Sequence, residues 1–471
     1  MSERPATRTE RDSMGEMEVP FDAYYGAGTA RAVLNFPISE RRFNRRFIAT
    51  LGLIKQFAAE VNHELGLLDQ RLADAISRAA REVVVGKLDR WFVVDVFQTG
   101  SGTSTNMNAN EVIANRAAEL LGAAKGARHV VHPNDHVNLG QSSNDVFPTA
   151  MQVAAARGIR ESLLPALEYL ERMLRYKSDE LWPLIKTGRT HLQDAMPIRL
   201  GQEFLGYAGQ LDKALAHCTA ALEELAELPL GGTAVGTGAG THPEFASRVA
   251  SRLSADTGIP FAETDKHFSA QATLDTVVSA SSALRGGAIA LFKIASDIRL
   301  LASGPRAGIG EISLPAVQPG SSMMPGKVNP VVAESLTMVC AQVIGNDASI
   351  AFAGAAGSQL ELNVMMPIAA HCLLDSIELL SAASRNFTEN CVSGIRATDR
   401  GPALVSHGLM TVSALVPAIG YDAAAAIAHE AHASGRTIHE VARERTTLSD
   451  QELLSLLDPT KMTSHRGEAA D

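Results

Sequence analysis

Three long stretches of this 471-residue chain have helical spacing with apolar residues on more than one side, and they constrain the fold more than any other feature. They cover residues 198–228, 271–301 and 331–384. An average helix has about 11–12 residues, so these are unusually long. A helix that is apolar on several sides needs neighbours on each of them. Because one subunit would leave too much of this surface exposed, the sequence predicts an all-α fold with a long helical bundle that is completed in an oligomer.

The composition agrees with packed helices and argues against a nucleic-acid partner. Apolar residues make up 46% of the chain, charged residues 20% and aromatic residues only 5%, whereas strands are usually richer in aromatic and β-branched residues. The formal net charge is −10, and a protein that binds nucleic acid needs a basic surface. An anionic substrate must therefore be held by local donors against an unfavourable overall field.

Cysteine usage and hydropathy indicate a cytoplasmic protein without a membrane partner. The four cysteines are widely spaced and form no C-x-x-C pair, so we expect neither a metal site nor a disulfide framework. Residues 1–11 lack the apolar segment of a secretory signal. Residues 275–303 are the most apolar stretch, but four charged side chains interrupt them, so we expect a core helix rather than a spanning one. Residues 467–471 are expected to be a frayed tail.

Shorter patterns predict further helices on either side of an irregular segment. Helical spacing covers residues 45–67, 70–85, 111–117 and 146–175. Residues 181–197 show no such spacing and are expected to be irregular. Near the C-terminus, residues 420–422 are expected to cap a helix that ends close to Gly435.

The chain is expected to have three domains and no nucleotide cofactor. We divide it into an N-terminal domain (1–141), a central helical-bundle domain (142–396) and a small C-terminal domain (397–471). The glycine-rich segment 231–238 lacks the spacing of a dinucleotide- or phosphate-binding loop, and no strand precedes it. A structural turn is the better interpretation of that segment.

Residues 320–330 form a polar segment punctuated by glycine and proline. Gly320 and Gly326 permit backbone angles that other residues avoid, while the two prolines prevent the segment from continuing as a helix. Lys327 and Asn329, two residues apart, can both point toward one bound anion if the chain is extended there. Such a loop suits a substrate with carboxylates and a step in which negative charge grows on an oxygen. The structural alternative is a polar surface connection.

Three other polar segments are open to a structural and a functional interpretation. Ser101-Gly102-Thr103 can hold a carboxylate or make a tight turn. Ser142-Ser143-Asn144-Asp145 reads first as an N-cap cluster for the helix that follows. Thr190 to Asp194 places His191 beside a hydroxyl, but most of the 14 histidines must have no catalytic role. Considered together, these segments favour the functional interpretation, because each lies at a helix end and carries hydroxyl or amide donors.

The four segments 101–106, 142–145, 190–194 and 321–329 resemble, block by block, those that build the active site of class II fumarases in the fumarase/aspartase superfamily. The resemblance runs from Glu10-Arg11-Asp12-Ser13-Met14-Gly15 to the region around Gly435. It implies an all-α, three-domain fold with a twenty-helix tetramer core. It also implies active sites that draw residues from three subunits, and no metal or redox cofactor.

The resemblance also implies roles for individual residues. Ser321 matches the base, His191 the partner that handles protons, and Glu334 the acid that orients this histidine. Eleven positions match the segments that hold the substrate: Ser101, Gly102, Thr103, Ser142, Ser143, Asn144, Thr190, Ser322, Lys327, Val328 and Asn329. The substrate implied is a small dicarboxylate, and the reaction is the reversible hydration of fumarate to (S)-malate.

Two alternatives remain, of which one is a different enzyme on the same fold and the other is a protein without catalytic activity. Aspartate ammonia-lyase (aspartase) shares much of the pattern, and Ala23-Tyr24-Tyr25-Gly26 resembles it. His132 and Ser143, however, stand where aspartases usually carry Asn and Thr. Active-site segments outweigh outer ones, so fumarase is favoured. A helical structural or assembly protein is the non-enzymatic alternative, but Ser321, His191 and Lys327 are all present.

Residues His132, Pro133, Asn134 and Asp135 resemble a second dicarboxylate site that lies outside the catalytic pocket of fumarases. The structural alternative is a solvated loop with a helix-capping role. The arginine that the family carries before this motif is offset by one residue here, at Arg128.

Overall fold

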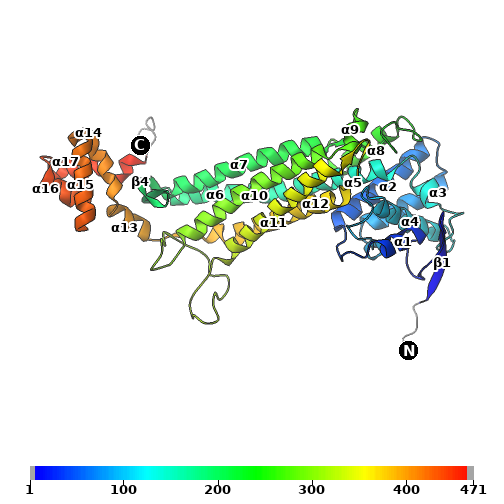
Figure 1. Ribbon diagram of the computed structural model, residues 1–471, viewed down its shortest axis with the longest axis horizontal. Coiled ribbons are helices and arrows are strands. Elements are labelled where there is room, and N and C mark those ends of the chain that lie inside the picture. Colours follow the sequence, from blue (N-terminus) through cyan, green and yellow to red (C-terminus); the bar gives the residue numbers. More distant parts are fainter. Residues whose placement is uncertain (1–5, 464–471) are drawn as a thin grey trace. The chain divides into compact units, whose positions relative to one another are not determined.

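A computed structural model describes residues 6–463, so the expected tail at 467–471 lies outside the described residues. Helices dominate, and the strands of the described residues form five two-stranded sheets, which confirms the all-α fold class (Figure 1). Contacts divide the chain into two compact units. The first comprises residues 1–165, 215–288 and 341–381, and the second comprises 166–214, 289–340 and 382–471. The expected three-domain division stays a prediction.

Short and medium helices form much of the first unit. Its helices outside the long bundle are α1 (Ala27–Asn35), α2 (Arg45–Glu64), α3 (Gln70–Val84), α4 (Thr103–Leu120), α5 (Ser143–Gly158), α8 (Phe245–Thr257) and α9 (His267–Ala272). Strands β1 (Thr7–Asp12) and β2 (Gly15–Pro20) make an antiparallel hairpin before α1. A short π-helical turn, η2 (Pro133–Val137), connects α4 toward α5.

Local capping signals explain where α2 and α3 begin. The side chain of Asn44 accepts a hydrogen bond from the Phe47 N–H, and Asp69 does the same for Arg71 and Leu72. Both are residues that satisfy the free N–H groups of a helix start. The expected helices at 45–67 and 70–85 are confirmed. In the core beside them, Phe43, Phe47 and Phe147 form an aromatic cluster with ring centroids 4.3 to 5.7 Å apart.

Five long helices make up the bundle: α6 (Leu164–Leu181), α7 (Leu200–Leu225), α10 (Asp275–Leu301), α11 (Val331–Gly357) and α12 (Met366–Asn390). Helices α7, α10, α11 and α12 contribute residues to both units. In the first unit, Asp347 on α11 accepts hydrogen bonds from Ser281 and Arg285 on α10. In the second unit, the Tyr207 hydroxyl on α7 donates to Asp297 on α10. Polar contacts thus fix the alignment of otherwise apolar helices.

The single long pattern expected over residues 331–384 is wrong, because the chain reverses within it. Strands β8 (Ser358–Gln359) and β9 (Leu362–Asn363) form a small hairpin between α11 and α12. The Asn363 side chain donates to the Ala353 carbonyl near the end of α11. Both helices bury apolar residues, so the apolar pattern continues across the turn and does not mark it.

By length and composition alone, three helical segments among the described residues could span a membrane. Helical segments Asp275–Leu301, Val331–Gly357 and Met366–Gly394 pass on those criteria, with mean hydropathy of 1.3, 1.3 and 1.2. We expected the charged residues in 275–303 to exclude a membrane span, and this expectation is wrong, because the composition of Asp275–Leu301 does not exclude one. Only 44% and 39% of the windows on α10 and α11 are buried, so apolar surface on these two helices remains free to meet other chains.

Small helices close the second unit: α13 (Arg400–Ser406), α14 (Val416–Ile419), α15 (Tyr421–Ser434), α16 (Ile438–Arg445) and α17 (Asp450–Leu456). A separate cluster of buried apolar residues lies among them. Capping boxes at Thr437 and Ser449 start α16 and α17. Helix α15 ends at Gly435 with φ 72°, which confirms the expected end. At its start, the side chains of residues 420–422 provide no N-cap hydrogen bond.

Candidate active site

Two of the four polar segments form the starts of α4 and α5 in the first unit. Gly102 adopts φ 74°, and a Cβ there would lie 2.0 Å from the Phe147 ring. Only glycine allows this approach, which brings the two helix starts together. Residues 103–106 form the first turn of α4. The free N–H groups of a helix start favour a bound anion.

Hydroxyl and amide groups cluster at these two helix starts. The Ser101 and Thr103 hydroxyls lie 2.7 Å apart. Ser142 and Asp145 form a capping box at the start of α5, which confirms the capping interpretation. The Ser143 hydroxyl is not part of this capping box. Its Oγ accepts a hydrogen bond of 3.0 Å from the Asn106 side chain. Asn144 donates to the Ala234 carbonyl in the glycine-rich segment.

A cavity of about 1150 Å³ in the first unit connects Thr103 with the His132 motif. Its lining includes several cationic or titratable side chains: Arg11, Arg31, Arg128, His129, His132 and His136. His132 Nδ1 accepts from the N–H groups of Asn134 and Asp135, which confirms the capping role. Despite its offset in the sequence, the Arg128 guanidinium lies 3.1 Å from His132 Nε2. Burial and the charge of Arg128 lower the pKa of His132.

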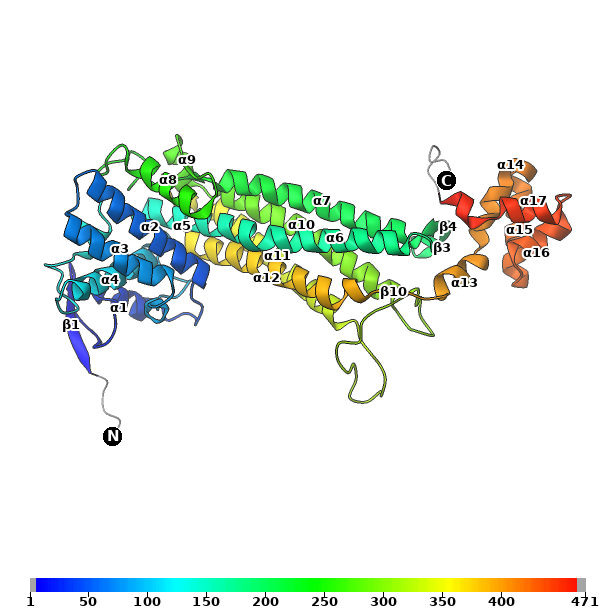
Figure 2. The same cartoon turned by 180° about the vertical axis from the view of Figure 1, so that it is seen from behind.

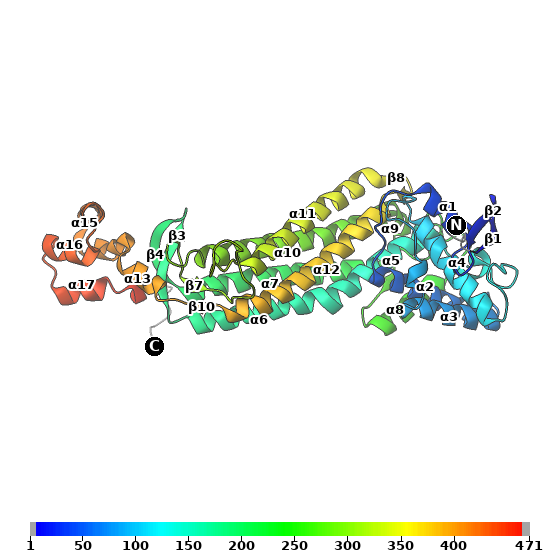
Figure 3. The ribbon, with the colours of Figure 1, turned by 90° about the horizontal axis from the view of Figure 1, so that it is seen from below.

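A β-hairpin of two strands lies in the second unit (Figure 3), and its pairing places His191 at the turn. Strands β3 (Ile185–Thr190) and β4 (Gln193–Arg199) pair so that Thr190 faces Gln193. His191 and Leu192 form the two-residue turn with φ 56° and 61°, angles that side chains with a Cβ rarely adopt. The segment 181–197, expected to be irregular, is therefore mostly a hairpin. Strained backbone of this kind concentrates at functional sites.

A group of four charges, of which Lys186 and Glu311 are buried, anchors this hairpin. Lys186 on β3 lies 2.8 Å from Glu203 and 2.9 Å from Glu311. Arg189, also on β3, contacts both carboxylate oxygens of Glu311, which is 1% exposed. Glu311 directly precedes β7 (Ile312–Ser313) and the segment that carries Ser321. The cluster therefore links the histidine hairpin to the start of the fourth polar segment.

The fourth segment, between α10 and α11, projects from the helices that flank it (Figure 2). Ser321 Oγ accepts hydrogen bonds from the N–H groups of Met323 and Met324, at 3.2 and 3.0 Å. The Asn329 side chain donates to the Gly320 carbonyl and closes the base of the loop. The Ser322, Lys327 and Val328 side chains are exposed. The same loop thus carries an exposed cation and a hydroxyl that receives two N–H donors.

Glu334 lies in the first turn of α11, and its carboxylate is 4.0 Å from Arg299. Within the described part of one chain, no hydrogen bond joins Glu334 or Ser321 to His191. The candidate residues therefore fall into two groups. Ser101 to Asn144 belong to the first unit, whereas Thr190, His191 and the residues from Ser321 to Glu334 belong to the second.

The sequence and the fold match one group of known proteins along nearly the whole chain. A family described as "Lyase" matches residues 15–345, and one described as "Fumarase C C-terminus" matches residues 412–464. "Fumarate hydratase class II" from Methylorubrum extorquens is 52% identical over 98% of both chains, and that from Halobacterium salinarum is 55% identical over 98% of this chain and 97% of its own. The chain belongs to the class II fumarase family.

Solved structures agree with this assignment to the class II fumarases. Recombinant class II fumarase from Schistosoma mansoni superposes with a TM-score of 0.94 at 40% identity, over 97% of this chain and 99% of its own. The fumarate lyase:delta crystallin of Brucella melitensis bound to cobalt gives 0.93 at 44% identity, over 98% and 100%. The relatives named here by activity are fumarate hydratases rather than aspartases. Within residues 6–463 of this chain, no group of three or more His, Cys, Asp or Glu side chains could hold a metal ion.

Sequence reasoning missed several residues that hold the candidate site in place. Lys55 on α2 donates to Asn138 and Gln141, the residues just before Ser142. Asn106 joins that network to Ser143. A signal existed for Lys55, because it is a lone charge seven residues after Ile48 and four after Leu51, on the apolar stripe of its helix. Glu311 carried no comparable signal.

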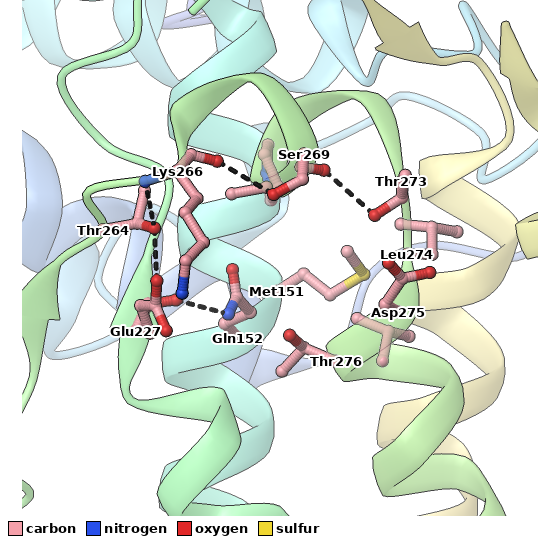
Figure 4. A pocket seen from close by; sticks show the side chains of 13 residues that line it. Met151, Gln152, Glu227, Thr264, Lys266, Ser269, Thr273, Leu274, Asp275 and Thr276 are labelled. Atoms are coloured by element: carbon pink, nitrogen blue, oxygen red, sulfur yellow. Dashed lines mark hydrogen bonds between the residues drawn. The ribbon is translucent and has the colours of Figure 1, made fainter.

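A smaller cavity of about 140 Å³ in the first unit lies outside the candidate residues (Figure 4). Several of its polar groups pair with one another. Thr264 donates to Glu227, whose carbonyl accepts from Gln152, and Ser269 donates to the Lys266 carbonyl. None of the residues that line this cavity is a candidate site residue, so it adds nothing to the candidate site.

We expect Glu311→Ala to lower the free energy of unfolding by about 3–5 kcal/mol, the usual cost of leaving buried charges without their partner. Lys186 would keep only Glu203, and Arg189 would lose both carboxylate contacts. Denaturant-induced unfolding followed by circular dichroism measures the change. Glu203→Ala is the matched control, with an expected loss of about 1 kcal/mol because Lys186 then keeps Glu311. Equal losses in the two variants would contradict the anchoring role of Glu311.

Proposed function

We propose that this class II fumarase catalyses the reversible hydration of fumarate to (S)-malate. One observation carries the chemistry: the Ser321 hydroxyl accepts hydrogen bonds from two backbone N–H groups on a loop that also bears Lys327. Donors of this kind favour the alkoxide over the neutral hydroxyl. An alkoxide on a projecting loop can act as the base that removes a proton from carbon.

The substrate is a dianion, and the proposed contacts are donors. Ser101, Thr103, Ser142, Ser143 and Asn144 lie at the starts of two helices, where free N–H groups and the helix dipoles attract a carboxylate. Thr190, Lys327 and Asn329 supply further donors from the second unit. Local donors of this density capture an anion although the chain carries a formal net charge of −10.

In the malate-to-fumarate direction, Ser321 takes the proton from C3. The C–H electron pair moves into the adjacent carboxylate and forms an aci-carboxylate with two negative charges. Lys327 and Asn329 stabilise this charge, and losing one such donor costs about 3–4 kcal/mol of barrier.

The second half of the reaction needs an acid. The C2 hydroxyl leaves as water when it receives a proton through a water molecule held by His191. Glu334 orients the imidazole. The reaction needs no metal or redox cofactor, because the proton transfers and the charge stabilisation are supplied by side chains.

We further propose a cytoplasmic homotetramer whose sites are shared between subunits. Within residues 6–463 of one chain, no hydrogen bond joins Glu334 or Ser321 to His191, which supports a site that another chain completes. The partly buried faces of the long helices support assembly. Large apolar side chains exposed on α10 and α11 include Ile289, Phe292, Leu300, Met338, Ile344 and Phe352.

The His132 motif is proposed as a second dicarboxylate site. Support comes from the cavity that it lines and from Arg128, which reaches His132 and supplies a fixed positive charge. Because the pKa of His132 is lowered, Arg128 rather than the imidazole would hold an anion at neutral pH. Arg128→Ala is the variant that tests binding there.

Ultraviolet absorbance with malate and with aspartate as separate substrates tests the proposed activity. We expect turnover of malate to fumarate, and the reverse, without added metal or nucleotide. A chelator should leave the rate unchanged. Ammonia release from aspartate without turnover of malate would replace fumarase by aspartase, and no turnover of either substrate would favour a structural protein.

A further inference from the structure

A buried lysine lies beside the loop that starts the substrate-binding segment of α5. Lys55 projects from α2 and is 0% exposed. Its Nζ donates to Asn138 Oδ1 at 2.8 Å and to Gln141 Oε1 at 2.9 Å. Two turns further along α2, Asn62 donates to the Leu139 carbonyl. Helix α2 therefore holds the loop that leads into Ser142 from one side.

The same network reaches a proposed substrate contact. Asn106 Nδ2, on α4, donates to Asn138 Oδ1 at 3.2 Å and to Ser143 Oγ at 3.0 Å. Asn138 thus accepts from both Lys55 and Asn106. Asn106 is 1% exposed, and its Oδ1 has no hydrogen-bond partner among the described residues. The side-chain amide that contacts Ser143 therefore keeps an unused acceptor.

A buried carboxylate completes the electrostatics of this network. Asp145 is 0% exposed, and its carboxylate accepts from the N–H groups of Ser142, Gly231 and Thr233. Burial raises the pKa of Asp145, whereas these three donors oppose the shift. Three donors and no acceptor around the carboxylate favour its ionised form. A protonated Lys55 balances that charge.

We propose that Lys55 is a positioning residue of the dicarboxylate site, whose buried ammonium group orders residues 138–145 for binding and places a positive charge beneath the carboxylate that Ser142 to Asn144 receive. The assignment rests on the proposed function, because it supposes that these residues bind a dicarboxylate. It goes beyond the direct contacts, since Lys55 acts through Asn138, Gln141 and Ser143. Its charge acts at short range in a region from which water is excluded, where screening is weak.

The surroundings of Lys55 predict that its charge changes near neutral pH. Burial lowers the pKa of Lys55 to about 7, and the negative charge of Asp145 on α5 opposes this shift. The groups on the other neighbouring elements change this charge balance little. The partners of Lys55 in the loop are neutral amides, and α3 contacts α2 through the apolar residues Ala80 and Val84. Arg252 of α8 is paired with Glu60. Raising the pH through this range removes a proton from Lys55 and weakens its attraction for a dianion.

The test compares Lys55→Gln with Lys177→Gln in the full-length protein. Glutamine keeps hydrogen-bonding capacity but removes the charge. Lys177 is the matched control, because it is also buried but donates hydrogen bonds to Glu180 and the Ile395 carbonyl, neither of which belongs to the candidate site. We expect Lys55→Gln to raise KM for fumarate about 10- to 100-fold with kcat changed less than about threefold, the pattern of lost ground-state binding. Lys177→Gln should leave both constants unchanged.

The pH profile and a non-reacting ligand separate positioning from a merely structural role. Wild-type KM should rise from about pH 6 to about pH 8, and this rise should be absent in Lys55→Gln. Calorimetry with succinate, a dicarboxylate that cannot be hydrated, should show the same loss of affinity. Unchanged KM, pH profile and succinate affinity in a folded Lys55→Gln protein would overturn the proposal, even if its stability falls.

Two outcomes distinguish this proposal from the function on which it rests. If the wild-type protein neither hydrates fumarate nor binds succinate, the proposed function fails. If the wild type does both and the variants match it, only the role of Lys55 fails. If Lys55→Gln does not fold, the Asn106→Ala variant tests the proposal instead. It removes the hydrogen bond from Asn106 to Ser143 and leaves Lys55 in place. A KM raised at least about threefold supports the proposal, and an unchanged KM overturns it.

Discussion

Ser321→Ala is expected to lower kcat by about 10²- to 10⁴-fold, the range in which a positioned general base contributes. Dicarboxylate affinity should stay within about threefold, because the hydroxyl acts mainly in the transition state. Steady-state kinetics measures the first quantity and calorimetry with succinate measures the second. The physical reason lies in the loop, where the N–H groups of Met323 and Met324 can stabilise an alkoxide that alanine cannot form.

His191→Asn is the companion variant and should lower kcat less, by about 10- to 100-fold, since water can still reach the leaving hydroxyl. Exchange of the C3 proton of malate separates the two roles. We expect exchange to vanish in Ser321→Ala and to persist weakly in His191→Asn. If exchange survives in the serine variant and is lost in the histidine variant, His191 is the base and Ser321 only shapes the turn.

Mixing two inactive variants is expected to restore activity. Ser142→Ala removes a proposed contact from the first unit, and Ser321→Ala removes the proposed base from the second. If the two residues of one site come from different chains, random reassembly of equal amounts gives about a quarter of sites with both serines. Recovery of about a quarter of wild-type activity, from about 1% or less in each variant, is therefore the expected result.

Two controls make this experiment decisive. Each variant is dissociated and reassembled alone to measure its own background, and light scattering confirms tetramers in every sample. Absence of recovery in properly mixed tetramers would mean that Ser142 and Ser321 of one site belong to the same chain. A monomer by light scattering would contradict the whole shared-site architecture.

Features that depend on neighbouring residues could be predicted from the sequence. The capping box at Ser142, the start of α3 beyond Asp69 and the end of α15 at Gly435 all follow from local chemistry. A cap or a left-handed glycine satisfies backbone groups within a few residues of itself, so its effect is visible in a short window. The long bundle helices could also be predicted from the sequence, since their apolar spacing persists over many turns.

Features set by chain reversal could not be predicted in the same way. The apolar pattern of α11 continues into α12, and nothing in its period marks the small hairpin at residues 358–363. The β3–β4 hairpin turns at His191 and Leu192, neither of which is a typical turn residue. Tertiary contacts at Glu311 hold the base of this hairpin, and they override the weak local preference of its turn.

The sequence by itself determined the helical class, the main helix starts and the four polar segments that carry the family resemblance. Only the tertiary structure decided what holds those segments in place. Lys55 meets Asn138 and Gln141 across 83 and 86 positions of sequence, and Arg189 meets Glu311 across 122. A buried charge is tolerated only where partners surround it. Those partners come from distant elements, so the pairs become visible only when the folded chain brings them together.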